Sequence, residues 1–127
     1  MPSHLESMLA TQMKMLGITY RSEVKFAAEH VGLGPGIRKR LSEAGLKNWR
    51  ADFVIGKLLV ECDGGLYLSG GGRHQRGTGY EDDLDKYHHA MRIGYTVYRC
   101  GSKLIKSGEA VQFITEYIAR SRSEQDF

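Results

Sequence analysis

Hydrophobic and polar residues recur with two different periods along the chain, and these periods predict its secondary structure. Apolar residues at helical spacing predict helices over 4–16, from Thr78 to about Ile93, and after Ser107. Alternating apolar residues predict strands over 20–27, on both sides of Gly56-Lys57 within 49–65, and over 95–100. A short basic helix around 36–44 is expected inside an insertion at 31–48. The resulting order, α-β-β-β-α-β-α, predicts an α/β fold.

The two strands around Gly56-Lys57 form the most informative segment. A two-residue loop that begins with glycine favours a tight hairpin turn, which pairs Ile55 with Leu58 and places Asp52 opposite Glu61. Because side chains alternate between the faces of a strand, one face is expected to build core and the other a site. The expected core face carries Trp49, Ala51, Phe53, Ile55, Leu58, Val60 and Cys62. The expected site face carries Arg50, Asp52, Val54, Leu59, Glu61 and Asp63.

Two carboxylates on cross-strand neighbours repel each other and destabilise a sheet. Either a divalent cation such as Mg²⁺ or a shared proton offsets that repulsion, or the register differs and both acids are solvated. The residue types alone leave these three alternatives open.

The wider pattern resembles a known superfamily. Asp52, followed after eight residues by Glu61-Cys62-Asp63, resembles the PD-(D/E)XK nuclease signature, in which a metal-binding acid on one strand precedes an E-x-K element on the next. The stretch from about residue 49 to 100 is similar to compact, often phage-encoded nucleases related to very-short-patch-repair endonucleases. The segments that carry this similarity are WRADFVI, LLVECDGG, GRHQRG, DKY and GYTVYR. This resemblance implies an αβββαβ core with a mixed four-stranded sheet flanked by helices, plus a C-terminal helix.

The resemblance also implies roles for individual residues. Asp52 and Glu61 are expected to hold Mg²⁺, for which Mn²⁺ can substitute, together with the backbone carbonyl of Cys62 and with Asp63. Asp63 stands where the superfamily usually has lysine, and Lys86 on the following helix is the expected replacement. The alternative for Lys86 is an ordinary surface pair with Asp82, four residues earlier on the same helix.

Further candidates surround this centre. The resemblance implies that His74, in a glycine-rich loop near 64–79, acts near the scissile phosphate, where a histidine can serve as general base or acid because imidazole titrates near neutrality. Arginine side chains suit bidentate phosphate contacts, and exposed basic runs suit the nucleic-acid backbone. Glu6 resembles a first-helix metal-binding acid of the superfamily, although a capping box with Ser3 explains it equally well. The expected nucleic-acid contacts are Arg73, Arg76, Arg38, Lys39, Arg40 and Tyr87.

Length and composition are compatible with this interpretation. The 127 residues suit a single domain, and a net charge of +3 is distributed as basic clusters around acidic ones. The two cysteines exclude a disulfide framework and a four-ligand Cys/His zinc site. Without an apolar run of about 18 residues or a secretory signal, neither a membrane span nor export is expected, and the default location is the cytoplasm.

The sequence therefore predicts a metal-dependent endonuclease that hydrolyses DNA and senses its structure, such as a nick, flap or branch. The missing E-x-K lysine supports an alternative, a catalytically inactive DNA-binding or assembly module with the nuclease fold. An RNA-directed nuclease is a second alternative, and homodimerisation is left open.

Overall fold

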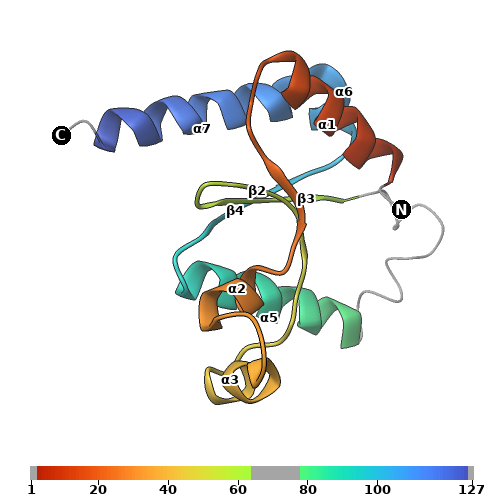
Figure 1. Ribbon diagram of the computed structural model, residues 1–127. Coiled ribbons are helices and arrows are strands. Elements are labelled where there is room, and N and C mark those ends of the chain that lie inside the picture. The colour runs from red at the N-terminus through yellow and green to blue at the C-terminus, as the bar shows by residue number, and fades with distance from the viewer. Residues whose placement is uncertain (1–2, 64–77, 126–127) are drawn as a thin grey trace. The chain divides into compact units, whose positions relative to one another are not determined.

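The computed structural model describes residues 3–63 and 78–125. It is an α/β protein with a mixed four-stranded sheet, in the order β1-β2-β3-β4, flanked by helices and followed by a C-terminal helix (Figure 1). This confirms the predicted fold class. The elements are α1 (His4–Met15), β1 (Arg21–Val24), α2 (Phe26–Val31), α3 (Ile37–Glu43), β2 (Ala51–Ile55), β3 (Leu58–Cys62), α5 (Thr78–Arg92), β4 (Thr96–Cys100), α6 (Ser102–Ser107) and α7 (Glu109–Gln125).

The described residues form two compact units. The first comprises 3–19, 62–63 and 100–125, and the second comprises 20–61 and 78–99. None of the helices within these ranges has the length and apolarity that a bilayer span requires.

Helices α1, α6 and α7 make up most of the first unit (Figure 1). The predicted cap is present, because the Glu6 N–H donates to the Ser3 hydroxyl oxygen at 3.1 Å. The Gln12 side-chain amide donates to the Ile105 carbonyl at 3.0 Å and so links α1 to α6. Buried side chains at helical spacing line one side of α1 and of α7, and Ile105 of α6 is buried as well: Leu5, Leu9 and Met13 in α1, and Ala110, Val111 and Ile114 in α7.

The register of the hairpin is the predicted one. Gly56 adopts a φ of 60°, which glycine reaches without steric cost, and Ile55 pairs with Leu58 in the antiparallel β2/β3 ladder. Strands β3 and β4 run parallel: the Thr96 N–H donates to the Lys57 carbonyl before β3, and the Asp63 N–H donates to the Cys100 carbonyl after it, each at 2.8 Å. Helix α5 is therefore the crossover connection of a β-α-β unit.

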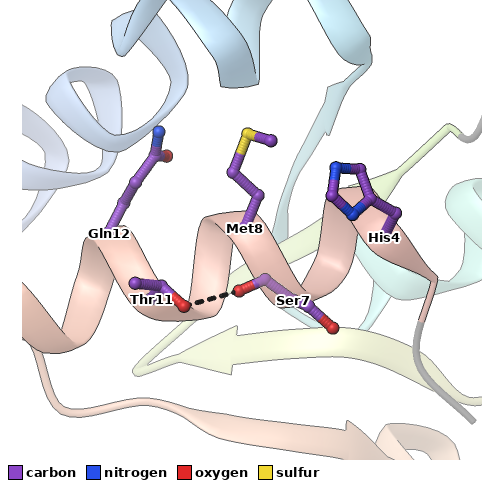
Figure 2. Close-up of a pocket in the computed structure, with 5 residues that line it drawn as sticks. All are labelled: His4, Ser7, Met8, Thr11 and Gln12. Carbon is purple, nitrogen blue, oxygen red and sulfur yellow. Dashed lines mark hydrogen bonds between the residues drawn. The ribbon is translucent and has the colours of Figure 1, made fainter.

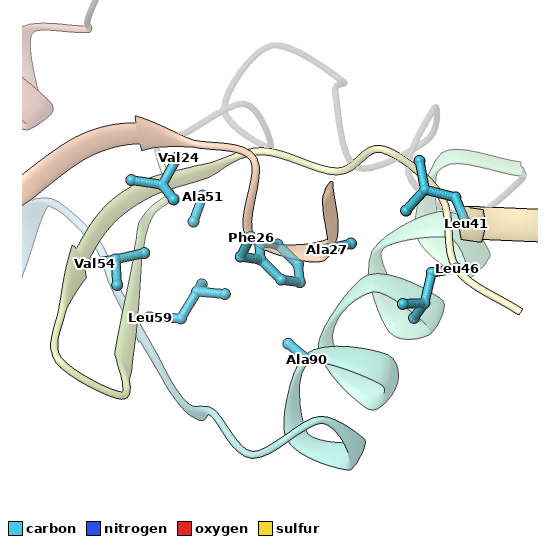
Figure 3. Packing of buried hydrophobic residues seen from close by; sticks show 9 residues of the cluster. All are labelled: Val24, Phe26, Ala27, Leu41, Leu46, Ala51, Val54, Leu59 and Ala90. Carbon is cyan, nitrogen blue, oxygen red and sulfur yellow. The ribbon is translucent and has the colours of Figure 1, made fainter. Parts of the chain in front are cut away.

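The core of the second unit lies where α2 and α5 meet the hairpin. Phe26 of α2, Val54 of β2, Leu59 of β3 and Ala90 of α5 are all buried there (Figure 3). The expectation that the face carrying Val54 and Leu59 builds only a site is therefore wrong. Crossover helices cover the faces of a sheet that contains parallel strands, so this face is also core. The opposite-face residues Phe53, Ile55, Leu58 and Val60 are buried as well.

Two local predictions were wrong in their details. The expected strand over 20–27 ends at Val24, and α2 begins at Phe26, where FAAEH contains the helix-favouring residues alanine and glutamate. In α5 the helical spacing of Leu84, Tyr87 and Met91 predicts that they face inward, but Leu84 and Met91 are 43% and 56% exposed, whereas Ala90 is fully buried. The helix is rotated so that Ala90 meets the sheet.

The burial of Leu59 yields a prediction for stability. Replacing the fully buried Leu59 with alanine should destabilise the fold by about 2–5 kcal/mol, because transfer free energy and packing are both lost. The matched variant Leu33→Ala, at a position 68% exposed, should change stability by less than about 0.5 kcal/mol. Urea unfolding of both variants tests this, and equal midpoints would contradict the assignment of the core.

Candidate functional site

The hairpin brings two predicted site residues together. The β2/β3 register continues from the Phe53–Val60 pair to place Asp52 across from Glu61, and the Asp52 N–H donates to Glu61 Oε2 at 3.0 Å. Glu61 is buried, with 5% of its surface exposed, while Asp52 is half-buried. The predicted proximity of these two acids is confirmed, and the alternative in which both are solvated is wrong for Glu61.

A third predicted residue reaches the same pair from α5. The Lys86 ammonium forms an ion pair with Glu61 Oε1, and the two side chains are only 15% and 7% exposed. Lys86 lies one turn before the buried Ala90, so both residues share the inner face of the helix. The alternative surface pair does not form, because Asp82 instead pairs with Lys47 at 3.7 Å.

Burial controls the protonation of Glu61. Desolvation favours the neutral acid and raises the pKa of Glu61 to about 7, and the nearby Asp52 carboxylate adds to the rise. The Lys86 ammonium and the Asp52 N–H lower the pKa of Glu61 but do not cancel the effect of burial. The ammonium also supplies positive charge beside the two acids, so a metal is not required to explain their proximity.

The donor set is compatible with Mg²⁺. This ion typically takes one or two carboxylates and completes its octahedron with waters and substrate phosphate oxygens. Within 3–63 and 78–125, no group of three or more His, Cys, Asp and Glu side chains could hold a metal. Asp52 and Glu61 are the two predicted carboxylate ligands that the hairpin brings together, and Glu61 is already paired with Lys86. Ligation by Asp63 and by the Cys62 carbonyl stays a prediction.

Other predicted residues have varied positions. Arg73, His74 and Arg76 lie outside the described residues. Glu6 belongs to α1 in the first unit, where its N–H serves the cap, and its metal-binding role stays a prediction. Tyr87 follows Lys86 on α5, and the Arg99 guanidinium lies 4.8 Å from the centre of its ring.

The basic segment of α3 divides into two parts. Arg38 and Lys39 are exposed, as a phosphate contact requires. Arg40 instead turns its guanidinium onto the preceding loop, where it donates to carbonyl oxygens. The acceptors are the backbone oxygens of Val31, Gly32, Leu33, Gly34 and Pro35. Its structural role is to hold this loop, which a run of basic letters does not reveal.

The position of Glu23 beside Asp52 was not predicted from the sequence. Glu23 lies in β1 between Ser22 and Val24, which pair with Phe53 and Ala51 of β2. The register therefore places Glu23 directly opposite Asp52. Its φ of 51° is unusual for a residue with a side chain, and its carboxylate is 4.0 Å from Arg50. Only the β1/β2 register reveals this position, since no short turn joins these strands.

An open hollow lies along α1 in the first unit. His4, Ser7, Met8, Thr11 and Gln12 line it (Figure 2). Its five residues all come from one helix, and none of the predicted site residues is among them.

Comparisons of this chain with protein-family models, with curated proteins and with solved structures found no match.

The raised pKa of Glu61 predicts a pH-dependent stability. A carboxyl with a pKa of about 4.5 unfolded and about 7 folded stabilises the fold fully below pH 4.5, and this stability is lost as the pH rises through 7. The free energy of unfolding of the wild type, measured relative to that of Glu61→Gln, should therefore fall by up to about 3 kcal/mol between pH 4.5 and pH 7. Urea unfolding of both proteins from pH 4.5 to 7.5 measures the difference, and a constant difference would contradict the assignment.

The position of Arg40 yields a second prediction. Arg40→Lys keeps the charge but loses most of the carbonyl contacts, so it should destabilise the protein by about 1–3 kcal/mol. Arg38→Lys, on the same helix and exposed, should be neutral within about 0.5 kcal/mol. Thermal unfolding compares the two variants, and equal melting temperatures would show that the loop does not depend on Arg40.

Proposed function

We propose that this protein is a Mg²⁺-dependent nuclease that hydrolyses DNA phosphodiester bonds, with Mn²⁺ able to replace Mg²⁺. The observation that supports this most is the ion pair between the Lys86 ammonium and the buried Glu61 carboxylate, which also accepts from the backbone N–H of Asp52 on the neighbouring strand. Two acids on neighbouring strands and one lysine are the groups that the superfamily resemblance requires. The helix supplies the lysine that the E-x-K position lacks.

The three groups have separate roles in the proposed reaction. Asp52 and Glu61 provide the hard oxygen ligands for the ion. When bound, Mg²⁺ lowers the pKa of a coordinated water and neutralises charge on the phosphoryl oxygens. Lys86 donates hydrogen bonds to the attacking water or to a phosphate oxygen, and so orients them and stabilises the negative charge of the transition state.

The exposed basic residues Arg38 and Lys39 support a nucleic-acid substrate. Contacts between such side chains and phosphates are independent of sequence and weaken as salt concentration rises. Recognition of nicks, flaps or branches belongs to this proposal, with His74 near the scissile phosphate and with Arg73 and Arg76 holding the DNA strand.

One observation favours a second candidate. Because Lys86 already offsets the charge of Glu61, the same three residues can serve as a structural ion pair in a non-catalytic DNA-binding module. The two candidates differ in cleavage and agree in DNA binding.

Cleavage assays with defined variants test the proposed function. The wild type should cut at least one labelled DNA among single-stranded, duplex, nicked, flap and four-way-junction substrates, in Mg²⁺ or Mn²⁺. Asp52→Asn should abolish cleavage, since a ligand is lost, and Lys86→Met should slow it by about 10²–10³-fold. The matched variant Lys47→Met, whose side chain is 67% exposed in a surface pair, should cut at the wild-type rate.

The outcomes separate the candidates. DNA binding without cleavage by the wild type would favour the non-catalytic module. Cleavage that survives in folded Asp52→Asn would place the active site elsewhere, and preferential cleavage of a matched RNA strand would reassign the substrate. Circular dichroism of each variant confirms that it is folded.

A further inference from the structure

Helix α5 exposes an apolar stripe on the outer side of the helix. Tyr80, Leu84 and Met91 are 49%, 43% and 56% exposed, and they are three of the six exposed large hydrophobic residues within 3–63 and 78–125. Their spacing of four and then seven residues aligns them along one side of a helix with 3.6 residues per turn. The inner side of α5, with Lys86 and Ala90, is already occupied by the sheet. The stripe is thus a second apolar face, separate from the core.

Exposed acidic and basic side chains follow one edge of this stripe in a definite order. Glu81 and Asp85 stand in the N-terminal half, and His88 and Arg92 stand in the C-terminal half. Helical spacing places all four on the same flank. Like charges four residues apart, as at Glu81 and Asp85, destabilise a helix unless positive charge approaches from outside.

A second copy of the same helix, lying antiparallel, meets these requirements. In an antiparallel pair related by a two-fold axis, the same flank of each helix lies against that of the other copy. The two chains run in opposite directions there, so the N-terminal half of one flank meets the C-terminal half of the other. Glu81 of one copy then lies near Arg92 of the second copy, and Asp85 lies near His88 of the second copy. Leu84 falls near the centre of the contact. The order of acidic and basic side chains is self-complementary only in this orientation.

We propose that the face of α5 formed by Tyr80, Leu84 and Met91 is the contact of a two-fold symmetric homodimer. Nucleic acid is a poor occupant, because Glu81 and Asp85 repel phosphates. A helix of 15 residues spans about 22 Å, so the contact is smaller than the ~1,600 Å² of a standard interface, and micromolar affinity is expected. This inference does not depend on the proposed nuclease function.

Sedimentation of the full chain, without DNA or metal, tests the proposal. The mass should rise from 14.3 kDa toward twice that value as the concentration rises through the micromolar range. Leu84→Asp should stay monomeric at all these concentrations, whereas the control Leu33→Asp, at an exposed position outside α5, should dimerise like the wild type. A monomeric wild type, or dimerisation of Leu84→Asp, would overturn the proposal.

Charge exchange tests the orientation. Glu81→Arg and Arg92→Glu should each weaken dimerisation at least tenfold, because like charges then meet. An equimolar mixture of the two variants should form heterodimers, because each copy then carries the charge that the other requires. Heterodimers that fail to form from folded variants would overturn the antiparallel arrangement. Asp85→Lys and His88→Glu form a second such pair, which avoids Arg92 and its hydrogen bond to the Ala44 carbonyl.

Discussion

The buried carboxylate of Glu61 is the feature on which this site depends. It is the one charged or polar residue that is buried within 3–63 and 78–125, and it accepts from the Asp52 N–H and from the Lys86 ammonium. Removing one partner of such a pair leaves a charge without compensation in a poorly solvated place, which is strongly destabilising. The hairpin, the acid pair and the position of α5 are therefore linked through one side chain.

The same contact accounts for the surface of α5. Once Lys86 and Ala90 face the sheet, helical geometry directs Leu84 and Met91 outward, although both residues are apolar. A helix with one apolar face in the core and another in solvent gains free energy when association removes the second face from water. The rotation that completes the candidate site thus also creates the proposed dimer contact.

Features set by neighbouring residues could be predicted from the sequence, whereas those set by distant residues could not. Gly56 fixed the turn, and with it the register that joins Asp52 to Glu61, while Ser3 fixed the start of α1. The rotation of α5 could not be predicted, because Leu84 and Met91 have the spacing of a core stripe and only the contact with Glu61 decides between two apolar faces. The structural role of Arg40, which the sequence predicts as a nucleic-acid contact, could not be predicted either, because its partners are backbone oxygens that no sequence pattern displays.

Broadening of NMR signals by a paramagnetic ion tests most directly whether Asp52 and Glu61 bind a divalent metal. In spectra of the ¹⁵N-labelled full chain, substoichiometric Mn²⁺ should broaden the backbone amides of Asp52 and Glu61 before any others, and Asp52→Asn should abolish this effect. Broadening that begins instead at exposed acids such as Asp82 and Asp85, with Asp52 and Glu61 unaffected, would contradict the account. It would show that these two carboxylates hold no metal ion, and that the pairing of Glu61 with the Lys86 ammonium is a structural contact only.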